Sequence, residues 1–359
     1  MDQLRLGIVG CGLRVCHHGG CVFRDCQDSA RIVGMCDPVA EKRVRAGKMY
    51  SEEFRYEIPV FPSLREMAEA TGVEAVYVAT PNDTHCEAVL EAFDLGLHVL
   101  CEKPMDITLA KCDRMIAAAE TSGRILGLGM QMHYRERYHK VRELIAEGTI
   151  GEPGMVWCTE YRPPFKQEKD WVWQSWHSGG AIVEKNCHHY DILDLWVGSE
   201  PTTVYASGNI LKLHTGGGVE SDIVDNAWII NDYASGARAM VGICFLAGWD
   251  QGHYREFGVH GTRGSVTFSS KDGEILHVQT ENGERTEYAI DHDLRGGIYR
   301  DFVECACTGR QPLVTGERGR RSLLVPIAAE LSILEKRPDL LPNCKWRYLK
   351  WCVPCMAVV

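Results

Sequence analysis

The sequence predicts an α/β protein with two domains, a doubly wound parallel sheet followed by a mostly antiparallel sheet. A glycine-rich turn at residues 7–12 follows the first apolar segment. Short apolar strands and amphipathic helical patterns then alternate up to about residue 125, which is typical of a parallel sheet with covered faces. Between residues 203 and 290, segments of strand pattern follow one another without helices, which indicates an antiparallel sheet.

The first 125 residues are expected to form the first domain. Its strands are expected at residues 4–10, 31–36, 60–61, 75–80, 97–101 and 125–129, of which the third is poorly marked. Helical patterns lie between them, at 38–50, 64–71, 84–95 and 109–122. Gly72, Gly96 and Gly123 stand where these helices would need a left-handed C-terminal cap.

Residues 126–337 are expected to form the second domain, and residues 338–359 an apolar C-terminal tail. A helix is predicted at 138–147, a strand at 155–161 and a helix at 180–197. Strands are then expected at 203–210, 227–234, 237–246, 255–261, 265–270 and 275–280, and helices at 298–308 and 319–335.

Composition excludes several classes of protein. The formal net charge of −10 argues against a nucleic-acid partner, which requires a basic surface. No apolar run approaches the roughly 20 residues that cross a bilayer, so no membrane partner is expected. The N-terminus enters a strand without an export signal, and we expect a cytoplasmic protein.

The 16 cysteines are expected to be buried thiols in a reducing compartment. Cys11, Cys16, Cys21 and Cys26 are evenly spaced, but a step of five residues turns a helix by ~140° and scatters them around its axis. Their spacing matches no iron–sulfur pattern. Residues 352–355 have redox-motif spacing but lie in the tail, so no metal or redox centre is expected.

The glycine turn predicts a dinucleotide site. Gly10 and Gly12 would let the backbone approach a pyrophosphate, although Val15 replaces the third glycine of the usual fingerprint. Asp37 ends the second strand, where its carboxylate would hydrogen-bond the ribose and repel a 2′-phosphate, so NAD is favoured over NADP. In the alternative interpretation, Asp37 merely caps the helix that follows it.

Two further strand ends would face the same crevice. After the fourth strand, Asn82 is expected on the nicotinamide side and His85 is expected to close the site; alternatively, this turn only begins a helix. After the fifth strand, Lys103 would hydrogen-bond a substrate hydroxyl, and Glu102 would orient the lysine or hold a ribose. The expected cofactor contacts are Gly10, Gly12, Leu13, Arg14, Asp37, Thr80, Pro81, Asn82, His85, Glu102 and Lys103.

The helix predicted at 180–197 carries an acid, a base and an acid on one face. Glu184, His188 and Asp191 are spaced four and three residues apart. Two flanking carboxylates would raise the proton affinity of His188, which suits a general base. Zinc is a competing interpretation because Cys187 and His189 are also potential ligands, but the two-histidine i, i+4 spacing of helical zinc sites is missing.

The loop before this helix is rich in tryptophan. Indole faces stack on the apolar face of a pyranose, so Trp171 and Trp176 are candidate walls of a sugar pocket. Arg162 and His177 are polar candidates there. Core or subunit packing is the alternative role for these tryptophans.

Together these segments resemble the glucose–fructose oxidoreductase/inositol dehydrogenase/MocA family. The resemblance rests on Gly10-x-Gly12, on Thr80-Pro81-Asn82, on Glu102-Lys103-Pro104, on residues 138–151, on the helix with Glu184, His188 and Asp191, and on residues 260–264. It implies a Rossmann domain, an α+β domain with a large open sheet often used for oligomerisation, and sugar or polyol substrates. Departures are Glu184, where an aspartate is usual, and Lys185 and Asn186, which replace an apolar residue and a glycine.

We therefore expect an NAD-dependent dehydrogenase acting on a secondary hydroxyl of a sugar, glycoside or polyol, with carbon 3 of a pyranose as a first guess. Lys103, His188, Glu184 and Asp191 are the expected catalytic residues, with His188 as base and Lys103 polarising the hydroxyl. Two alternatives stay open: a redox-assisted glycosidase or lyase acting through a keto-sugar, and a non-catalytic NAD- or sugar-sensing regulator. A homo-oligomer, assembled through the C-terminal sheet, is expected.

Overall fold

The computed structural model describes residues 3–16, 22–167, 169–248, 252–337 and 339–340. The predictions for Cys21, Cys352, Cys355 and most of the C-terminal tail therefore fall outside the described residues. Within these ranges, every helix is too short or too polar to cross a membrane.

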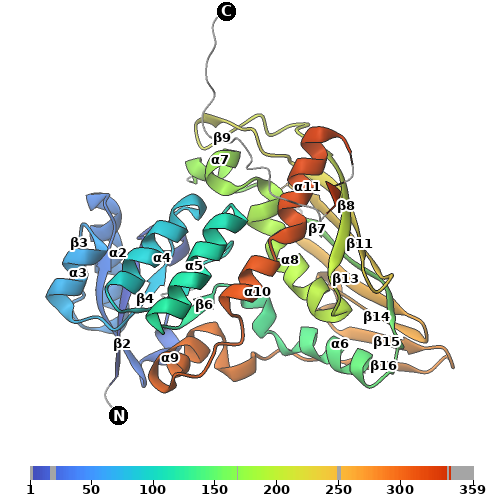
Figure 1. Cartoon of the computed structure of the whole chain (residues 1–359), viewed down its shortest axis with the longest axis horizontal. Coiled ribbons are helices and arrows are strands. Elements are labelled where there is room, and N and C mark those ends of the chain that lie inside the picture. The colour runs from blue at the N-terminus through green and yellow to red at the C-terminus, as the bar shows by residue number, and fades with distance from the viewer. Residues whose placement is uncertain (1–2, 17–21, 168, 249–251, 338, 341–359) are drawn as a thin grey trace, which may run out of the picture.

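The N-terminal domain is built on a six-stranded parallel sheet in the order β3-β2-β1-β4-β5-β6 (Figure 1). Its strands are β1 (Leu4–Val9), β2 (Ala30–Cys36), β3 (Val60–Phe61), β4 (Ala75–Val78), β5 (His98–Cys101) and β6 (Leu126–Leu128). All six predicted strands are present, including the poorly marked third. The chain reverses its direction of travel across the sheet between β1 and β4, and ligands bind at such a switch point in doubly wound folds.

The helices of this domain also follow the prediction. They are α1 (Leu13–Cys16), α2 (Ala40–Phe54), α3 (Leu64–Thr71), α4 (His85–Asp94) and α5 (Leu109–Ser122). Gly72 and Gly123 are the left-handed C-caps of α3 and α5, as expected. At the other ends, the side chains of Ser63 and Thr108 accept backbone N–H groups of the first turn, which fixes where these two helices begin.

The C-terminal domain contains a nine-stranded sheet in the order β16-β15-β14-β13-β7-β12-β11-β8-β17. Its strands are β7 (Pro153–Tyr161), β8 (Pro201–Asn209), β11 (Asn226–Tyr233), β12 (Arg238–Cys244), β13 (Tyr254–Gly261), β14 (Gly264–Ser269), β15 (Leu276–Thr280), β16 (Arg285–Tyr288) and β17 (Asp339–Leu340). A separate two-stranded sheet pairs β9 (Thr215–Gly216) with β10 (Val219–Glu220). In the large sheet β7 and β12 are parallel and the other described pairs are antiparallel, so the predicted mostly antiparallel sheet is confirmed.

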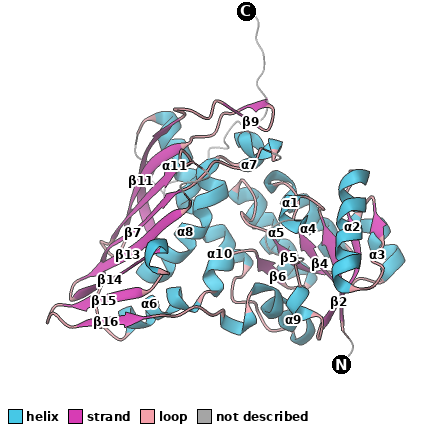
Figure 2. Ribbon diagram, turned by 180° about the vertical axis from the view of Figure 1, so that it is seen from behind, coloured by secondary structure: helices cyan, strands magenta, loops and turns pink. Residues whose placement is uncertain are grey.

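Helices cover the face of the large sheet that is turned toward the N-terminal domain (Figures 1 and 2). They are α6 (Glu136–Ala146), α8 (Ala181–Val197) and α11 (Leu324–Glu335), with the short helices α7 (Ser175–Ser178) and α10 (Gly316–Arg321) nearby. The single helix predicted at 319–335 is wrong, because the chain breaks at Ser322 and Leu323. Pro326 explains the break, since its ring blocks the carbonyl four residues earlier and removes one helix donor.

The chain crosses back to the N-terminal domain after the large sheet. Strand β6 belongs to the first sheet although it lies beyond the boundary expected at residue 125. Helix α9 (Ile298–Thr308) also packs on the N-terminal core, where the ring centres of Tyr299 and Phe23 are 4.8 Å apart. The N-terminal core is therefore completed by residues from both ends of the expected second domain.

Candidate active site

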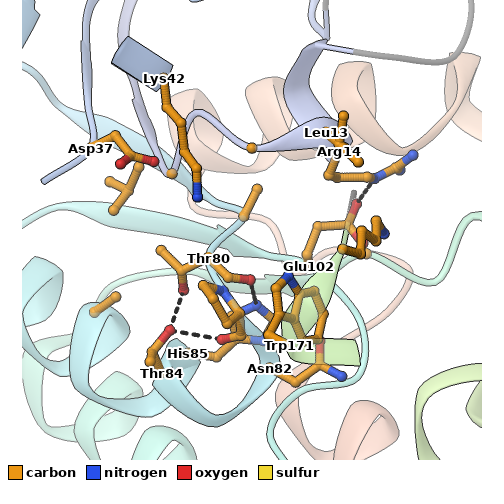
Figure 3. Close-up of a pocket in the computed structure, with 18 of the residues that line it drawn as sticks. Leu13, Arg14, Asp37, Lys42, Thr80, Asn82, Thr84, His85, Glu102 and Trp171 are labelled. Atoms are coloured by element: carbon orange, nitrogen blue, oxygen red, sulfur yellow. Dashed lines mark hydrogen bonds and ion pairs between the residues drawn. The ribbon is translucent and has the colours of Figure 1, made fainter. Parts of the chain in front are cut away.

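A cavity of about 1270 Å³ lies between the two domains. One side is formed by the turns that follow β1, β2, β4 and β5, and the other by the first half of α8 and by Arg162, Phe165, Lys169, Asp170 and Trp171. Figure 3 shows how the side chains from the N-terminal turns converge with Trp171. The end near Gly10, Gly12 and Asp37 is called the cofactor end below, and the end near Lys103, Glu184 and His188 the substrate end.

Two glycines shape the cofactor end for different reasons. Gly10 has φ +93°, and a Cβ there would lie 2.7 Å from the carbonyl oxygen of Ala79, so the packing of β1 against β4 requires glycine. A Cβ on Gly12 would meet no atom within 4 Å, because this residue borders the cavity. The open space beside Gly12 fits the close backbone approach of a dinucleotide pyrophosphate.

Asp37 lies at the same end and does not cap α2 as the alternative interpretation predicted, because the N-cap of α2 is Val39 and has no side-chain cap. Its Oδ1 accepts the N–H of Val39 (2.8 Å), which holds the start of α2, and its Oδ2 accepts the N–H of Cys11 (2.9 Å). The carboxylate therefore ties the glycine turn to the end of β2 while still lining the cavity. Lys42 of α2 extends into the cavity beside it (Figure 3).

The turn after β4 is held largely by its own contacts. Thr84 Oγ1 donates to the carbonyl of Pro81 (2.7 Å), and Asn82 Nδ2 donates to the carbonyl of Ser178 (2.9 Å), which links the two domains. The His85 ring is fully buried between the carbonyl oxygens of Pro104 (2.9 Å) and Thr80 (3.0 Å), and burial lowers its pKa. All these residues except Pro104 and Ser178 line the cavity.

Glu102 contacts the backbone of Lys103 rather than its ammonium, and both of its carboxylate oxygens have hydrogen-bond partners. Its Oε1 accepts Arg14 Nε (2.6 Å) and the Tyr77 hydroxyl, and its Oε2 accepts the backbone N–H of Lys103 (3.0 Å). Burial disfavours its charge and is the largest single influence, but Arg14, Tyr77 and Lys103 together outweigh burial and lower the pKa of Glu102. The carboxylate thus fixes the backbone at Lys103 and the direction of the Arg14 side chain.

Lys103 is tied to α8 across the cavity. Its Nζ lies 3.0 Å from Glu184 Oε1 and donates to the backbone carbonyl of Glu184 at 2.7 Å. Burial opposes the positive charge of Lys103 and is the largest single influence, but Glu184, Cys187 and Glu102 together outweigh it and raise the pKa of Lys103. The pKa of Glu184 is correspondingly lowered by Lys103 and Lys169, against the effect of burial. The pair is therefore an ammonium and a carboxylate at neutral pH.

His188 lines the same cavity, but the expected increase in its proton affinity is wrong. Glu184 turns to Lys103, and Asp191 turns away to His133 (Oδ2 to Nδ1, 2.8 Å) and Arg318 (Oδ1 to Nε, 3.0 Å). Burial, followed by the positive charges of Lys103 and Lys185, lowers the pKa of His188 well below its usual value. Its Nδ1 is buried without a hydrogen-bond partner among the described residues.

Asp191 is thus not brought to the site with the other three residues. It is buried with His133 and Arg318 and lies outside the described lining of the cavity. The reason is the direction of α8, which starts at the cavity and runs into the C-terminal core. Seven residues of helix rise by roughly 10 Å, so a residue two turns beyond Glu184 meets different neighbours.

Among the three tryptophans of the loop before α8, Trp171 alone belongs to the described lining of the cavity. Trp173 is fully buried in the C-terminal core, so the packing alternative is right for it. Trp176 is 51% exposed, and its ring lies tilted against that of His177, which pairs with Asp83 (Nδ1 to Oδ2, 2.9 Å). Neither Trp176 nor His177 belongs to the described lining, which corrects their assignment to the substrate pocket.

Arg162 lines the cavity as expected, together with two lysines that sequence reasoning did not assign, Lys169 and Lys185. Lys185 Nζ lies 3.1 Å from Oε1 of Glu160, a fully buried carboxylate that Arg162 approaches at 3.8 Å. A sequence signal for Glu160 exists, because it follows Val156 and Cys158 on the buried face of β7. A charge at such a position needs partners, but nothing local in the sequence names them.

Metal ligation by the α8 side chains is not supported by their placement. His189 Nε2 lies 2.7 Å from Glu160, whereas Glu184 and Asp191 face the partners given above. Within the described ranges, no three His, Cys, Asp or Glu side chains are grouped so as to hold a metal ion. The described cysteines are free thiols, and most are buried.

The chain matches two family models. Residues 4–130 match the Gfo/Idh/MocA oxidoreductase family, NAD-binding Rossmann fold, and residues 142–339 match the C-terminal alpha/beta domain of the same family. The chain is 29% identical to a myo-inositol 2-dehydrogenase of Thermotoga maritima over 345 residues, 93% of this chain and 97% of that protein. It is 25% identical to a scyllo-inositol 2-dehydrogenase (NAD⁺) of Bacillus subtilis, covering 94% of this chain and 96% of that protein.

Solved structures show the same fold. A levoglucosan dehydrogenase in complex with NADH and levoglucosan superposes with a TM-score of 0.80 at 19% identity, covering 95% of this chain and 100% of that chain. An aldose-aldose oxidoreductase of Caulobacter crescentus gives a TM-score of 0.78 at 22% identity, with 95% and 100% coverage. The resemblance noted in the sequence is confirmed: the chain belongs to the Gfo/Idh/MocA oxidoreductase family and carries its NAD-binding Rossmann domain.

Proposed function

We propose that this protein oxidises a secondary hydroxyl of a sugar, glycoside or polyol with NAD. The observation that carries the proposal is one cavity in which the Gly10–Gly12 turn and Asp37 lie at one end and Lys103, Glu184 and His188 at the other. The relatives named as inositol dehydrogenases support a polyhydroxylated ring as substrate. On the family resemblance, we propose carbon 3 of a pyranose as the position that is oxidised.

Each residue at the substrate end has a role that its electrostatics suit. Lys103 is charged and held by Glu184, so it can donate a hydrogen bond to the substrate oxygen and stabilise its developing negative charge. His188 is neutral at neutral pH, so a ring nitrogen is free to take the hydroxyl proton. NAD, when bound, supplies the acceptor for the hydride. Trp171 offers an apolar ring surface on which a sugar can stack.

His188→Ala tests the proposal. We expect NADH binding, followed by its fluorescence, to stay within about twofold, because His188 lies at the substrate end. Turnover on the best sugar found in a screen of monosaccharides, polyols and glycosides is expected to fall by ~10²–10⁴. Undiminished turnover would remove the assigned role of His188. A screen in which no sugar or polyol reduces NAD would favour the sensing regulator.

A second function is favoured by one relative. The chain is 27% identical over 298 residues to a protein of Mediterraneibacter gnavus named 2,7-anhydro-N-acetylneuraminate hydratase, a name that describes no net oxidation. Oxidation of the glycoside by NAD would give a keto-sugar with an acidified neighbouring C–H, from which the aglycone would leave by elimination. Addition of water and return of the hydride from NADH to the keto group would then complete a reaction without net oxidation. Release of aglycone from a glycoside without net NADH would establish this reaction, whereas stoichiometric NADH would establish the dehydrogenase.

We further propose a homo-oligomer formed through the outer face of the large sheet. Tyr205, Ile230 and Met240 lie side by side on β8, β11 and β12, and each is more than a third exposed. Trp228, two residues before Ile230, continues this apolar face at 49% exposure. Ile230→Asp is expected to lower the mass found by light scattering; an unchanged multimer or a wild-type monomer would contradict the interface.

A further inference from the structure

We propose that the substrate carries a negatively charged group, a carboxylate or a phosphate, which binds at the same end of the cavity as the hydroxyl that reacts. This inference rests on the proposed function and narrows its substrate class. It is drawn from an excess of cationic side chains at the substrate end of the cavity.

Four cationic side chains line this end. Lys103 and Lys185 come from different domains and each has a carboxylate partner, Glu184 at 3.0 Å and Glu160 at 3.1 Å. Arg162 lies 3.8 Å from the same Glu160 oxygen, so one carboxylate is shared between two cations. The fourth cation is Lys169.

Lys169 has no carboxylate within 4 Å among the described residues. Its contact is the Trp171 ring, 5.8 Å from Nζ to the ring centre. The neighbouring Asp170 also lines the cavity, but it is exposed and its Oδ1 accepts the N–H of Trp171. An ammonium beside an aromatic ring and facing a cavity is a direct partner for an anionic ligand.

Burial is the largest influence on the pKa values of Lys169 and Lys185. Burial lowers the pKa of Lys185, and Arg162 and Lys103 lower it further, although Glu160 opposes them. The pKa of Lys169 is lowered by burial and by Lys103, against Glu184. A ligand anion would offset the cost of burying these two ammonium groups, because charges in a partly buried site are poorly screened by water.

The pyrophosphate of the cofactor is the rival partner for these cations. The cofactor end offers the pyrophosphate a separate place, at the open space beside Gly12 in the turn that Asp37 holds. The cation nearest to that turn in sequence, Arg14, is already paired with Glu102. Arg162 and Lys185 belong to the C-terminal domain, with Lys185 one residue after Glu184 on α8. This placement favours the substrate as the partner, and the experiment separates the two.

The experiment measures binding by calorimetry on the NADH-loaded protein. The ligands are matched sets: D-glucose, D-glucuronate and D-glucose 6-phosphate, and the corresponding galactose compounds. We expect at least one acid to bind ten-fold or more tightly than its neutral counterpart, with affinity falling as salt is raised. The carboxylate and phosphate arms show which anion the site takes.

Lys169→Met removes the charge while keeping the length of the side chain, and Lys166→Met in the same loop is the control, because Lys166 lies outside the described lining. Lys169→Met should weaken binding of the preferred acid about ten-fold and leave the neutral sugar and NADH within twofold; Lys166→Met should change none of them. The proposal is overturned if no acid binds more tightly than its neutral counterpart, or if Lys169→Met weakens NADH instead. Acid binding without oxidation would refute the dehydrogenase and retain the anion site.

Discussion

The two ends of the cavity are built in different ways. The cofactor end is shaped mainly by the backbone. Gly10 allows β1 to pack closely against β4, Gly12 leaves space in the cavity, and Asp37 accepts two backbone N–H groups. At the substrate end, charged side chains from separate elements hold one another, as Lys103 and Glu184 do across the domains. Backbone turns are encoded by short motifs, whereas ion pairs over a separation of 81 residues are not. We therefore expect the cofactor end to be shared with other dinucleotide-binding proteins and the substrate end to be specific to this protein.

The largest expected effect is at the substrate end. Lys103→Met should lower kcat by ~10²–10³, the cost of losing one donor to a developing oxyanion. NADH affinity, measured by fluorescence titration, should change little. Lys42→Met is the matched control at the cofactor end, where we expect at most a few-fold rise in KM for NAD and an unchanged kcat. If both variants changed the same kinetic constant, the division of the cavity into two ends would fail.

The glycine pair tests the cofactor end. Gly10→Ala should lower the free energy of unfolding by about 1–3 kcal/mol, because φ is +93° and the carbonyl of Ala79 stands in the way of a Cβ. Gly12→Ala should unfold like the wild type in urea but bind NADH about ten-fold more weakly, because its Cβ enters the cavity. Equal NADH affinity in Gly12→Ala and wild type would show that the cofactor does not approach this turn.

Asp191 provides a comparison within one helix. Asp191→Asn should lower the free energy of unfolding by about 1–3 kcal/mol, because its carboxylate is buried against His133 and Arg318, and should leave kcat within about threefold. Glu184→Gln should do the opposite and lower kcat more than stability, because Glu184 contacts Lys103. A large loss of kcat with unchanged stability in Asp191→Asn would restore its catalytic assignment.

The smallest expected effect is a shift in the pH dependence of kcat/KM toward lower pH. The base form of His188 is required, so activity is lost as the pH falls through its pKa in the folded protein. Because burial and the lysines lower that pKa, the acid limb of kcat/KM should lie below pH 6.5. Circular dichroism at each pH is needed, since buried His85 and His189 also have lowered pKa values and weaken the fold as pH falls. An acid limb above pH 6.5 would contradict the electrostatics of the site.

Most of the fold could be predicted because its signals are local. Helices α3, α5 and α9 have the predicted bounds, since a capping side chain or a terminal glycine marks at least one end of each. The division of the last helix at Ser322 was missed, although Pro326 gave a local reason for it. The return of α9 to the N-terminal core was also missed, because an apolar face does not say which core it covers.

The residues of the site were predicted with less success than the fold. Residues on the strand-end turns reach the cavity, because all parallel strands deliver their carboxyl ends to one edge. Helical spacing correctly placed Glu184 and His188 on one face but carried no information on what Asp191 would meet. Lys169 escaped notice, because a lone lysine in a loop is usually a solvated surface charge until the opposite wall of a cavity is known.

Helix α9 has a consequence for engineering by recombination. Its residues Tyr299 and Phe302 cover Phe23 and Tyr77 of the N-terminal domain, about 170 residues after the last strand of that domain. A chimera that exchanges only the first 130 residues would set an unrelated aromatic surface against α9. The N-terminal folding unit is therefore discontinuous in sequence, and a stable exchange of this domain between relatives would require exchanging α9 as well.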